Sequence, residues 1–338
     1  MKKFFIAVTT VALATFGVSM AGAVELSGVA YIQTHGGHVA ALDLATGDVA
    51  RFNHGKPSDA VTVSKDGKTL FNFSLDGNSS ETDVATGKTT EWQKLGKKHC
   101  GSNYAPDGTI WVSDMADGHV YVYDPKSKKL VDSFPVAKSI CGVNFSKDGK
   151  YAYVSDMPGG FIAVVDVKTK KVVNKIEGAG NFIHRAEVSK DGSELWQSDG
   201  SELVVKDGKK TAIGVGYATG EATPGSVAII DLKSGKLKDR VLIGGNPHDV
   251  TFTPDGKYAL VVSRQLPERT DSAVIVVDTA TKRVVKMYSA CKACHGPAAV
   301  EIDEKKDGGR PFLCAIDVDW NAKKLPAGAE PLASFTEK

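Results

Sequence analysis

The amino-acid sequence predicts an all-β fold, a β-propeller of four-stranded antiparallel blades. Three observations lead to this prediction. A unit of about forty residues recurs along the chain, each unit contains apolar runs bounded by Asp-Gly turns, and no stretch beyond a turn or two shows a helical period. Four short strands in each repeat are typical of propeller blades, which stack around an axis and protect each other's edges.

The first strand of each unit leads into an Asp-Gly pair. The runs are residues 60–67 (AVTVSKDG), 142–149 (GVNFSKDG) and 249–256 (DVTFTPDG). Glycine tolerates the positive φ of a tight reversal, so each Asp-Gly pair is predicted to be a hairpin turn.

The third strand of each unit is an apolar run that ends in aspartate. It recurs at residues 39–43, 120–124, 162–166, 227–231 and 274–278. The amino-terminal unit, at residues 28–52, starts at its second strand and lacks a first strand. We expect a carboxy-terminal strand near residues 298–303 to serve as its first strand and to close the ring. This gives six blades, or seven if the tail around residues 311–318 forms its own.

Two motifs within these repeats point to a known superfamily. Residues 246–257 (NPHDVTFTPDGK) and 150–155 (KYAYVS) resemble YVTN-type propeller repeats. That superfamily includes the haem d1 domain of cytochrome cd1 nitrite reductase, and the resemblance covers nearly the whole mature chain. It implies the fold, whereas such propellers serve as enzymes, cofactor holders and surface proteins. Because this chain has no amino-terminal cytochrome domain, nitrite reductase activity is not carried over.

The amino terminus resembles an export signal. Lys2 and Lys3 precede an apolar run over residues 4–18, and residues 21–23 (AGA) suit a signal peptidase. We expect cleavage after Ala23, a periplasmic location, and a single propeller domain over residues 24–338. The run is shorter than the roughly 20 residues that span a bilayer, and no membrane span is expected in the mature chain.

Charge gives no sign of a polyanionic partner. Without Lys2 and Lys3 the chain carries 40 basic and 40 acidic side chains. This balance gives no reason to expect nucleic acid or an anionic membrane as a partner.

One register position collects side chains that bind metals. It lies seven residues before each Asp-Gly aspartate, and it holds Asp59, Cys100, Cys141, His184 and His248. In the sixth unit we place Cys294 or His295 there. The first strand of a blade lies nearest the propeller axis, so these side chains are predicted to meet at one end of the central channel. Thiolate and imidazole ligands suit copper, zinc or haem iron.

Simpler interpretations of these residues remain open. Either histidine alone is consistent with a structural turn or cap residue. Cys100 and Cys141 are consistent with a disulfide between adjacent blades. Asp59 is consistent with a side chain that accepts hydrogen bonds from nearby backbone amides. Cys314, on an apolar strand, fits a buried small residue, and His35 fits a solvated turn.

The run Cys291-Lys292-Ala293-Cys294-His295 is the attachment signature of a c-type haem in an exported protein. It predicts one covalent haem, with thioethers at Cys291 and Cys294 and His295 as the proximal ligand. His248 or His184 is then the candidate sixth ligand, and Arg185 the candidate partner of a haem propionate. The alternatives are a Cys/His metal site that includes these residues, or a disulfide between Cys291 and Cys294.

These features favour an exported redox propeller that transfers electrons or converts a small inorganic substrate, working with a periplasmic redox partner protein. The alternative is a non-haem copper- or zinc-binding propeller, an enzyme or a metal carrier, whose ligands come from the same Cys/His set. A non-catalytic binding scaffold with its cysteines paired is the third possibility.

Overall fold

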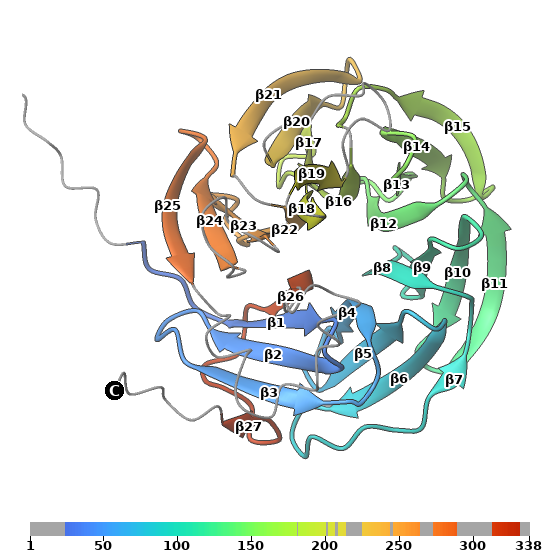
Figure 1. The fold of residues 1–338 in the computed structure, drawn as a ribbon. Helices are drawn as coiled ribbons and strands as arrows, with labels where there is room; N and C mark the ends of the chain where they lie inside the picture. Colours follow the sequence, from blue (N-terminus) through green and yellow to red (C-terminus); the bar gives the residue numbers. More distant parts are fainter. Residues whose placement is uncertain are drawn as a thin grey trace, which may run out of the picture.

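The computed structural model describes residues 24–180, 182–200, 202–206, 209–213, 225–243, 246–263, 273–288 and 313–331. Six antiparallel blades surround one axis in this part of the chain, which confirms the predicted six-bladed propeller (Figure 1). Within the described residues, no helix has the length and apolar character needed to cross a membrane.

Five blades have four strands each, numbered from the axis outwards. The first contains β4 (Ser58–Val63), β5 (Thr69–Ser74), β6 (Asn78–Asp83) and β7 (Gln93–Lys94). The second contains β8 (His99–Tyr104), β9 (Ile110–Asp114), β10 (His119–Asp124) and β11 (Lys129–Pro135). The third contains β12 (Ile140–Phe145), β13 (Tyr151–Asp156), β14 (Phe161–Asp166) and β15 (Lys171–Ile176).

The fourth blade contains β16 (Ile183–Val188), β17 (Glu194–Asp199), β20 (Ser226–Asp231) and β21 (Lys236–Leu242). Between β17 and β20 the chain forms a separate two-stranded sheet of β18 (Glu202–Lys206) and β19 (Lys209–Ile213). The fifth blade contains β22 (Pro247–Phe252), β23 (Tyr258–Ser263), β24 (Ala273–Asp278) and β25 (Arg283–Tyr288).

The sixth blade joins the two ends of the chain. Its innermost strand is β26 (Leu313–Asp319), followed by β1 (Val29–Thr34), β2 (His38–Asp43) and β3 (Val49–Asn53), with β27 (Glu330–Pro331) at the rim. The antiparallel register pairs Val29 with Asp319 and Ile32 with Ile316. Pairing of the carboxy-terminal inner strand with the amino-terminal unit is therefore confirmed.

The position predicted for that closing strand is wrong. Residues 313–319, and not the run near 298–303, pair with β1. The tail around 311–318 therefore contributes this inner strand and does not form a seventh blade. Two lateral hydrogen bonds hold β26 beside its neighbours: Asp249 accepts from the Ile316 amide at 2.9 Å, and Asp317 accepts from the Val63 amide at 2.7 Å.

The Asp-Gly turns behave as their sequence predicts. Gly67, Gly149 and Gly256 adopt φ values of 70°, 70° and 75°, in the left-handed region that favours glycine. In the first of these turns, the Asp66 carboxylate accepts a hydrogen bond from the Ser64 hydroxyl at 2.6 Å. Local sequence therefore fixes the hairpin between the two inner strands of each of these blades.

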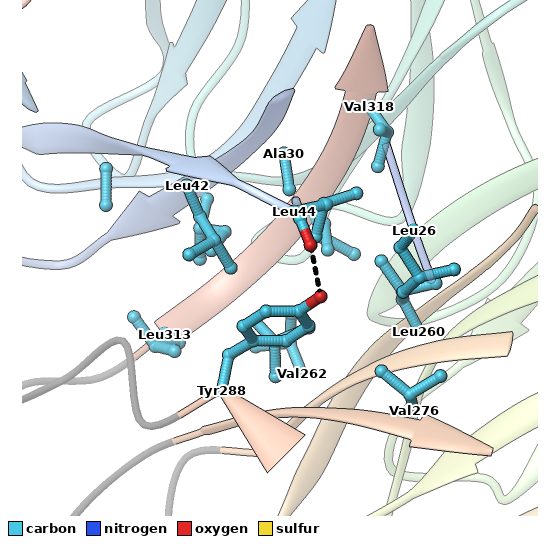
Figure 2. Packing of buried hydrophobic residues seen from close by; sticks show 14 residues of the cluster. Leu26, Ala30, Leu42, Leu44, Leu260, Val262, Val276, Tyr288, Leu313 and Val318 are labelled. Carbon is cyan, nitrogen blue, oxygen red and sulfur yellow. Dashed lines mark hydrogen bonds between the residues drawn. The ribbon is translucent and has the colours of Figure 1, made fainter. Parts of the chain in front are cut away.

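The hydrophobic core lies between neighbouring blades. Trp111 and Trp196 are buried in two of these interfaces. Figure 2 shows the interface between the sixth and fifth blades, where Leu42 packs with Leu260 and the Tyr288 hydroxyl donates to the Leu44 carbonyl at 2.5 Å. Each fully buried aliphatic side chain there contributes roughly 1.5–3 kcal/mol. Packing of this kind fixes the six inner strands around the axis.

Candidate cofactor site at the axial mouth

A single backbone irregularity recurs in the innermost strand of all six blades. Near its second residue, each of these strands carries one residue more than its partner, which shifts the antiparallel register. Such a β-bulge leaves one residue outside the ladder and redirects its side chain. The second residues, here called the mouth ring, are Asp59, Cys100, Cys141, His184, His248 and Cys314.

Five members of the mouth ring are the residues that the register predicted. The sixth is Cys314, which corrects our placement of Cys294 or His295 at this position. Cys314 is also buried on an apolar strand, as the sequence predicted. The other five residues lie seven positions before an Asp-Gly pair, but seven residues after Cys314 the chain reads Asn321-Ala322. Because the prediction relied on Asp-Gly pairs, it did not find Cys314. Asn321, at the position of the turn aspartate, is the sequence feature that could have identified Cys314.

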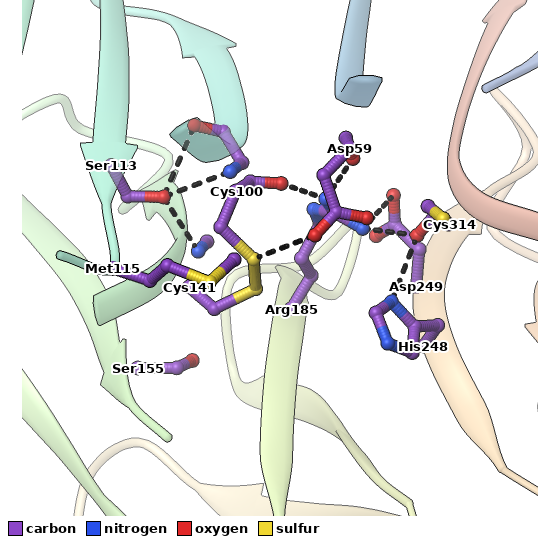
Figure 3. The surroundings of a disulfide bond; sticks show 12 residues. Asp59, Cys100, Ser113, Met115, Cys141, Ser155, Arg185, His248, Asp249 and Cys314 are labelled. Carbon is purple, nitrogen blue, oxygen red and sulfur yellow. Dashed lines mark hydrogen bonds and ion pairs between the residues drawn. A yellow bond between two sulfur atoms is a disulfide. The ribbon is translucent and has the colours of Figure 1, made fainter. Parts of the chain in front are cut away.

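Cys100 and Cys141 form a disulfide that joins β8 to β12, with their Cα atoms 4.9 Å apart. This is the alternative considered from the sequence. While the bond is intact, neither sulfur is a thiolate, so these two residues do not serve as the metal ligands we expected. Asp59 lies beside the bond, with Oδ2 3.4 Å from Cys100 Sγ (Figure 3).

His184 and His248 face each other on the other side of the mouth ring. Their ring centroids are 3.6 Å apart and the planes are tilted by 35°. Both side chains are buried. His248 Nδ1 lies 3.2 Å from the Cys314 carbonyl oxygen. A carbonyl only accepts, so Nδ1 donates and the lone pair of a neutral ring lies on Nε2. This is the usual orientation of a metal-ligating histidine.

His35 is a functional candidate that the sequence argument left as a solvated turn. It lies between β1 and β2, and its Nε2 is 3.1 Å from Asp59 Oδ1. The histidine nitrogen, an Asp59 oxygen and the Cys314 sulfur all lie within 4.8 Å of one another. Closure of the ring brings the amino-terminal hairpin beside β4 and β26. The prediction considered only the inner strands and therefore did not include a residue of this hairpin.

Arg185 follows His184 and lies under the mouth ring. Its terminal nitrogens donate to the backbone carbonyls of Asp59, Cys100 and Cys314 (Figure 3). Nη1 also lies 3.9 Å from Asp249 Oδ2. Both terminal nitrogens are thus already used by the protein. The sequence led us to expect that Arg185 pairs with a haem propionate. These hydrogen bonds instead indicate that Arg185 positions the backbone of the mouth ring.

Two glycines leave room for this arginine. A Cβ on Gly142, where φ is +104°, would lie 3.0 Å from Arg185 Cγ, and a Cβ on Gly101 would lie 3.1 Å from Arg185 Nε. The same Gly101 Cβ would lie 2.6 Å from Gly142 Cα. Absence of side chains here lets β8 and β12 approach each other closely while the arginine crosses the channel.

Three residues beyond the mouth ring, each inner strand carries a side chain with an oxygen atom. These residues, here called the lower ring, are Thr62, Asn103, Asn144, Glu187, Thr251 and Asp317. Five of them, all except Thr62, lie around a cavity of ≈ 130 Å³ that Arg185 and Asp249 also line. Several hydrogen bonds cross between strands: Thr62 contacts Ser102 at 2.7 Å, and Asn144 accepts from the Val188 amide at 3.2 Å.

Three acidic side chains that line this cavity have a raised pKa. Burial raises the pKa of Asp249 to about 6, although Arg185 and two backbone amides oppose the shift. Burial also raises the pKa of Glu187 and of Asp317, each to about 7. Repulsion by neighbouring carboxylates adds to each shift: Asp59 acts on Asp249, and Asp249 acts on both Glu187 and Asp317. Near neutral pH these groups therefore exchange protons, and Arg185 Nη1 lies 3.9 Å from Asp249 Oδ2.

The haem-attachment motif lies outside the described residues. Cys291, Cys294 and His295 belong to residues 289–312, between the end of β25 at Tyr288 and the start of β26 at Leu313. The described part of the chain therefore fixes only the two ends of this segment. One of them is next to Cys314, in the mouth ring.

Comparison with known proteins gives one partial family match. Residues 8–131, less than half of the chain, match the family described as outer membrane protein assembly factor BamB. No curated protein sequence matches the chain. The family match covers the amino-terminal blades and does not reach His184, His248 or the haem-attachment motif.

Among solved structures, the chain is similar to Kuenenia stuttgartiensis hydrazine synthase. The two are 26% identical, with a TM-score of 0.52, over 67% of this chain. The match covers 64% of the hydrazine synthase chain, so the present chain spans less than two thirds of that chain's length. Both comparisons are consistent with a propeller.

Proposed function

We propose that the protein is an exported redox propeller that carries one c-type haem at its axial mouth. Cys291 and Cys294 attach the haem, and His295 is its proximal ligand. The observation that carries the proposal is the mouth ring, which places His184 and His248 together at the end of the channel, with their ring centroids 3.6 Å apart. The similarity to hydrazine synthase supports a redox role.

The position of the motif in the chain supports this arrangement. The motif lies in the segment that links β25 to β26, and that segment ends two residues before Cys314 of the mouth ring. A haem attached there has candidate imidazole ligands within the same ring. His248 suits this role because its Nδ1 is held by the Cys314 carbonyl, which leaves Nε2 as the ligand nitrogen.

The chemistry that such a group supplies is the uptake and release of one electron at iron. The chain's own residues set the surroundings. His184 and His248 are buried, which excludes water from the ring, and Arg185 holds the backbone of three ring residues through their carbonyls. The acidic groups below, with pKa values of about 6 to 7, hold or release protons near neutral pH.

The proposal includes a periplasmic location and a periplasmic partner. The amino-terminal segment resembles a signal peptide, and the partially matching family is described as an outer membrane protein assembly factor. In this setting the protein exchanges electrons with a periplasmic redox protein, or converts a small inorganic substrate at the mouth.

Spectroscopy on the protein produced with a cytochrome c maturation system tests the haem. We expect a Soret band, and haem that stays with the chain after denaturation. Cys291→Ala with Cys294→Ala should abolish both. His248→Ala should alter the spectrum and the reduction potential, while His119→Ala, in β10 and outside the mouth ring, should change neither. A parent protein with no retained haem would refute the proposal.

A second candidate is a non-haem copper or zinc protein, an enzyme or a metal carrier. It is favoured by the nitrogen, oxygen and sulfur donors that meet within 4.8 Å at His35, Asp59 and Cys314. Elemental analysis of the purified protein distinguishes the two, since near-stoichiometric zinc or copper without iron supports this candidate.

A further inference from the structure

Three side chains from separate parts of the chain converge on one side of the mouth ring. His35 comes from the turn between β1 and β2, Asp59 from β4 and Cys314 from β26. Their donor atoms all lie within 4.8 Å of one another. Asp59 and Cys314 are buried, and the His35 side chain is 24% exposed.

We propose that His35, Asp59 and Cys314 bind a divalent metal ion of the zinc class. Zinc binds nitrogen, oxygen and thiolate sulfur at about 2.0–2.3 Å, so donors around a tetrahedral ion are roughly 3–4 Å apart. His35 Nε2 and Asp59 Oδ1 are already 3.1 Å apart. Small side-chain rotations bring all three donors to a common centre.

Charge balance favours such an ion at a buried place. One carboxylate and one thiolate together neutralise a 2+ ion, and the imidazole binds in its neutral form. Binding releases the proton of the Cys314 thiol. A buried charge costs much free energy unless it is paired or coordinated. The metal ion and its three ligands together carry no net charge, which suits a buried position at the end of the channel.

The backbone of two ligands is fixed before any ion binds. Arg185 donates to the carbonyls of both Asp59 and Cys314, and His248 Nδ1 also contacts the Cys314 carbonyl. Support of this kind, from groups outside the ligand set, is what orients ligands in metal sites.

A plain ion pair between His35 and Asp59 explains only two of the three residues. The Cys314 sulfur is the third donor within the same 4.8 Å. Among the residues that the structure describes, the other triad with suitable donors, Asp59 with Cys100 and Cys141, has both sulfurs in the disulfide. Three protein donors leave the fourth position of a tetrahedral ion for water or a small ligand, as in catalytic zinc sites.

This inference names the ligands of the non-haem candidate and is independent of the haem. The test therefore uses mature protein in which Cys291→Ala and Cys294→Ala remove haem attachment. In this background we expect one zinc ion for each chain, measured by elemental analysis and by competition with a chromogenic chelator. Cobalt should bind with a thiolate charge-transfer absorption band.

Single substitutions in that background assign the ligands. Loss of a group that only orients a ligand weakens metal binding by about 10- to 100-fold, so we expect Cys314→Ser and His35→Gln to weaken zinc binding by at least about 100-fold. Cys314→Ser should also remove the cobalt charge-transfer band. His119→Gln, a histidine in β10, is the matched control and should leave the affinity unchanged.

Two results would overturn the site. One is unchanged zinc affinity in both Cys314→Ser and His35→Gln. The other is loss of zinc in the background protein, which would place the metal on the Cys-x-x-Cys-His run. Circular dichroism checks the fold of each variant, and His35→Gln, at a partly exposed turn, decides the matter if Cys314→Ser does not fold. Failure of the haem proposal would show separately, as no Soret band in the parent.

Discussion

The mouth ring and the lower ring come from the same six strands, three residues apart, yet they differ in chemistry. At the mouth the backbone is bulged, and the side chains carry sulfur, imidazole nitrogen and one carboxylate. At the lower level the pairing is regular, and oxygen-bearing side chains form hydrogen bonds to neighbouring strands, as Asp317 does to the Val63 amide. The contrast indicates that ligand-type side chains gather at the mouth, where the disulfide also joins two strands, whereas the lower level links neighbouring strands through hydrogen bonds.

Arg185 lies between the two levels, so its loss is expected to have the largest effect. Arg185→Met removes the arginine donor from three buried carbonyls, of which the Cys314 carbonyl keeps His248 Nδ1, and it leaves Asp249 without its cation. Removal of one partner of a buried pair costs about 3–5 kcal/mol. Denaturant unfolding should show a loss of this size, whereas Arg283→Met, at an exposed position of β25, should change the stability by less than about 0.5 kcal/mol. A similar small effect for Arg185→Met would contradict the positioning role.

The disulfide is a covalent tie at the mouth, comparable to the hydrogen bonds of the lower ring. It closes a separation of 41 residues between β8 and β12. Cys100→Ser with Cys141→Ser is expected to lower the free energy of unfolding by about 2–4 kcal/mol, because the unfolded chain gains freedom.

The same double variant also tests whether Cys100 and Cys141 only join strands or also bind a metal. If the disulfide is only a tie, zinc binding at His35, Asp59 and Cys314 should persist, with affinity within about tenfold of the parent. A complete loss of zinc would instead show that Cys100 and Cys141 belong to the ligand set, as the sequence first suggested. Thiol counting before and after reduction verifies that the parent carries the bond.

The smallest expected effect concerns Asp317 and depends on pH. Burial raises the pKa of Asp317 to about 7, above the value of an unfolded chain, so the folded state binds more protons between about pH 4 and pH 7. Ionisation of this group therefore destabilises the fold as pH rises through 7. Asp317→Asn keeps an oxygen acceptor for the Val63 amide and removes the charge.

We therefore expect Asp317→Asn to be more stable than the parent at pH 8, by on the order of 1–3 kcal/mol, since one pKa unit corresponds to about 1.4 kcal/mol. Below about pH 4 the advantage should vanish. Unfolding curves of variant and parent across this range give the difference directly. Asp48→Asn, on an exposed turn, serves as the control. A variant that is less stable than the parent at pH 8 would show that the carboxylate acts as a bound anion there.

Sequence periodicity predicted five of the six mouth-ring residues because each is tied to a local Asp-Gly turn at a constant distance. Cys314 was missed because Asn321-Ala322 replaces that turn. His35 was missed for a different reason. It belongs to a hairpin turn and not to an inner strand, and its contact with Asp59 depends on how the first and last strands of the chain meet.

The sequence by itself determined the repeat, the strands and their turns, and the register that collects ligand-type residues, because these depend on near neighbours along the chain. Only the tertiary structure decided where the ring closes, that Cys100 and Cys141 are bonded, and that Arg185 is bonded to three carbonyls beneath the mouth. Contacts between residues more than forty positions apart depend on how the blades pack around the axis. A local sequence pattern contains no information on the spatial distance between such residues.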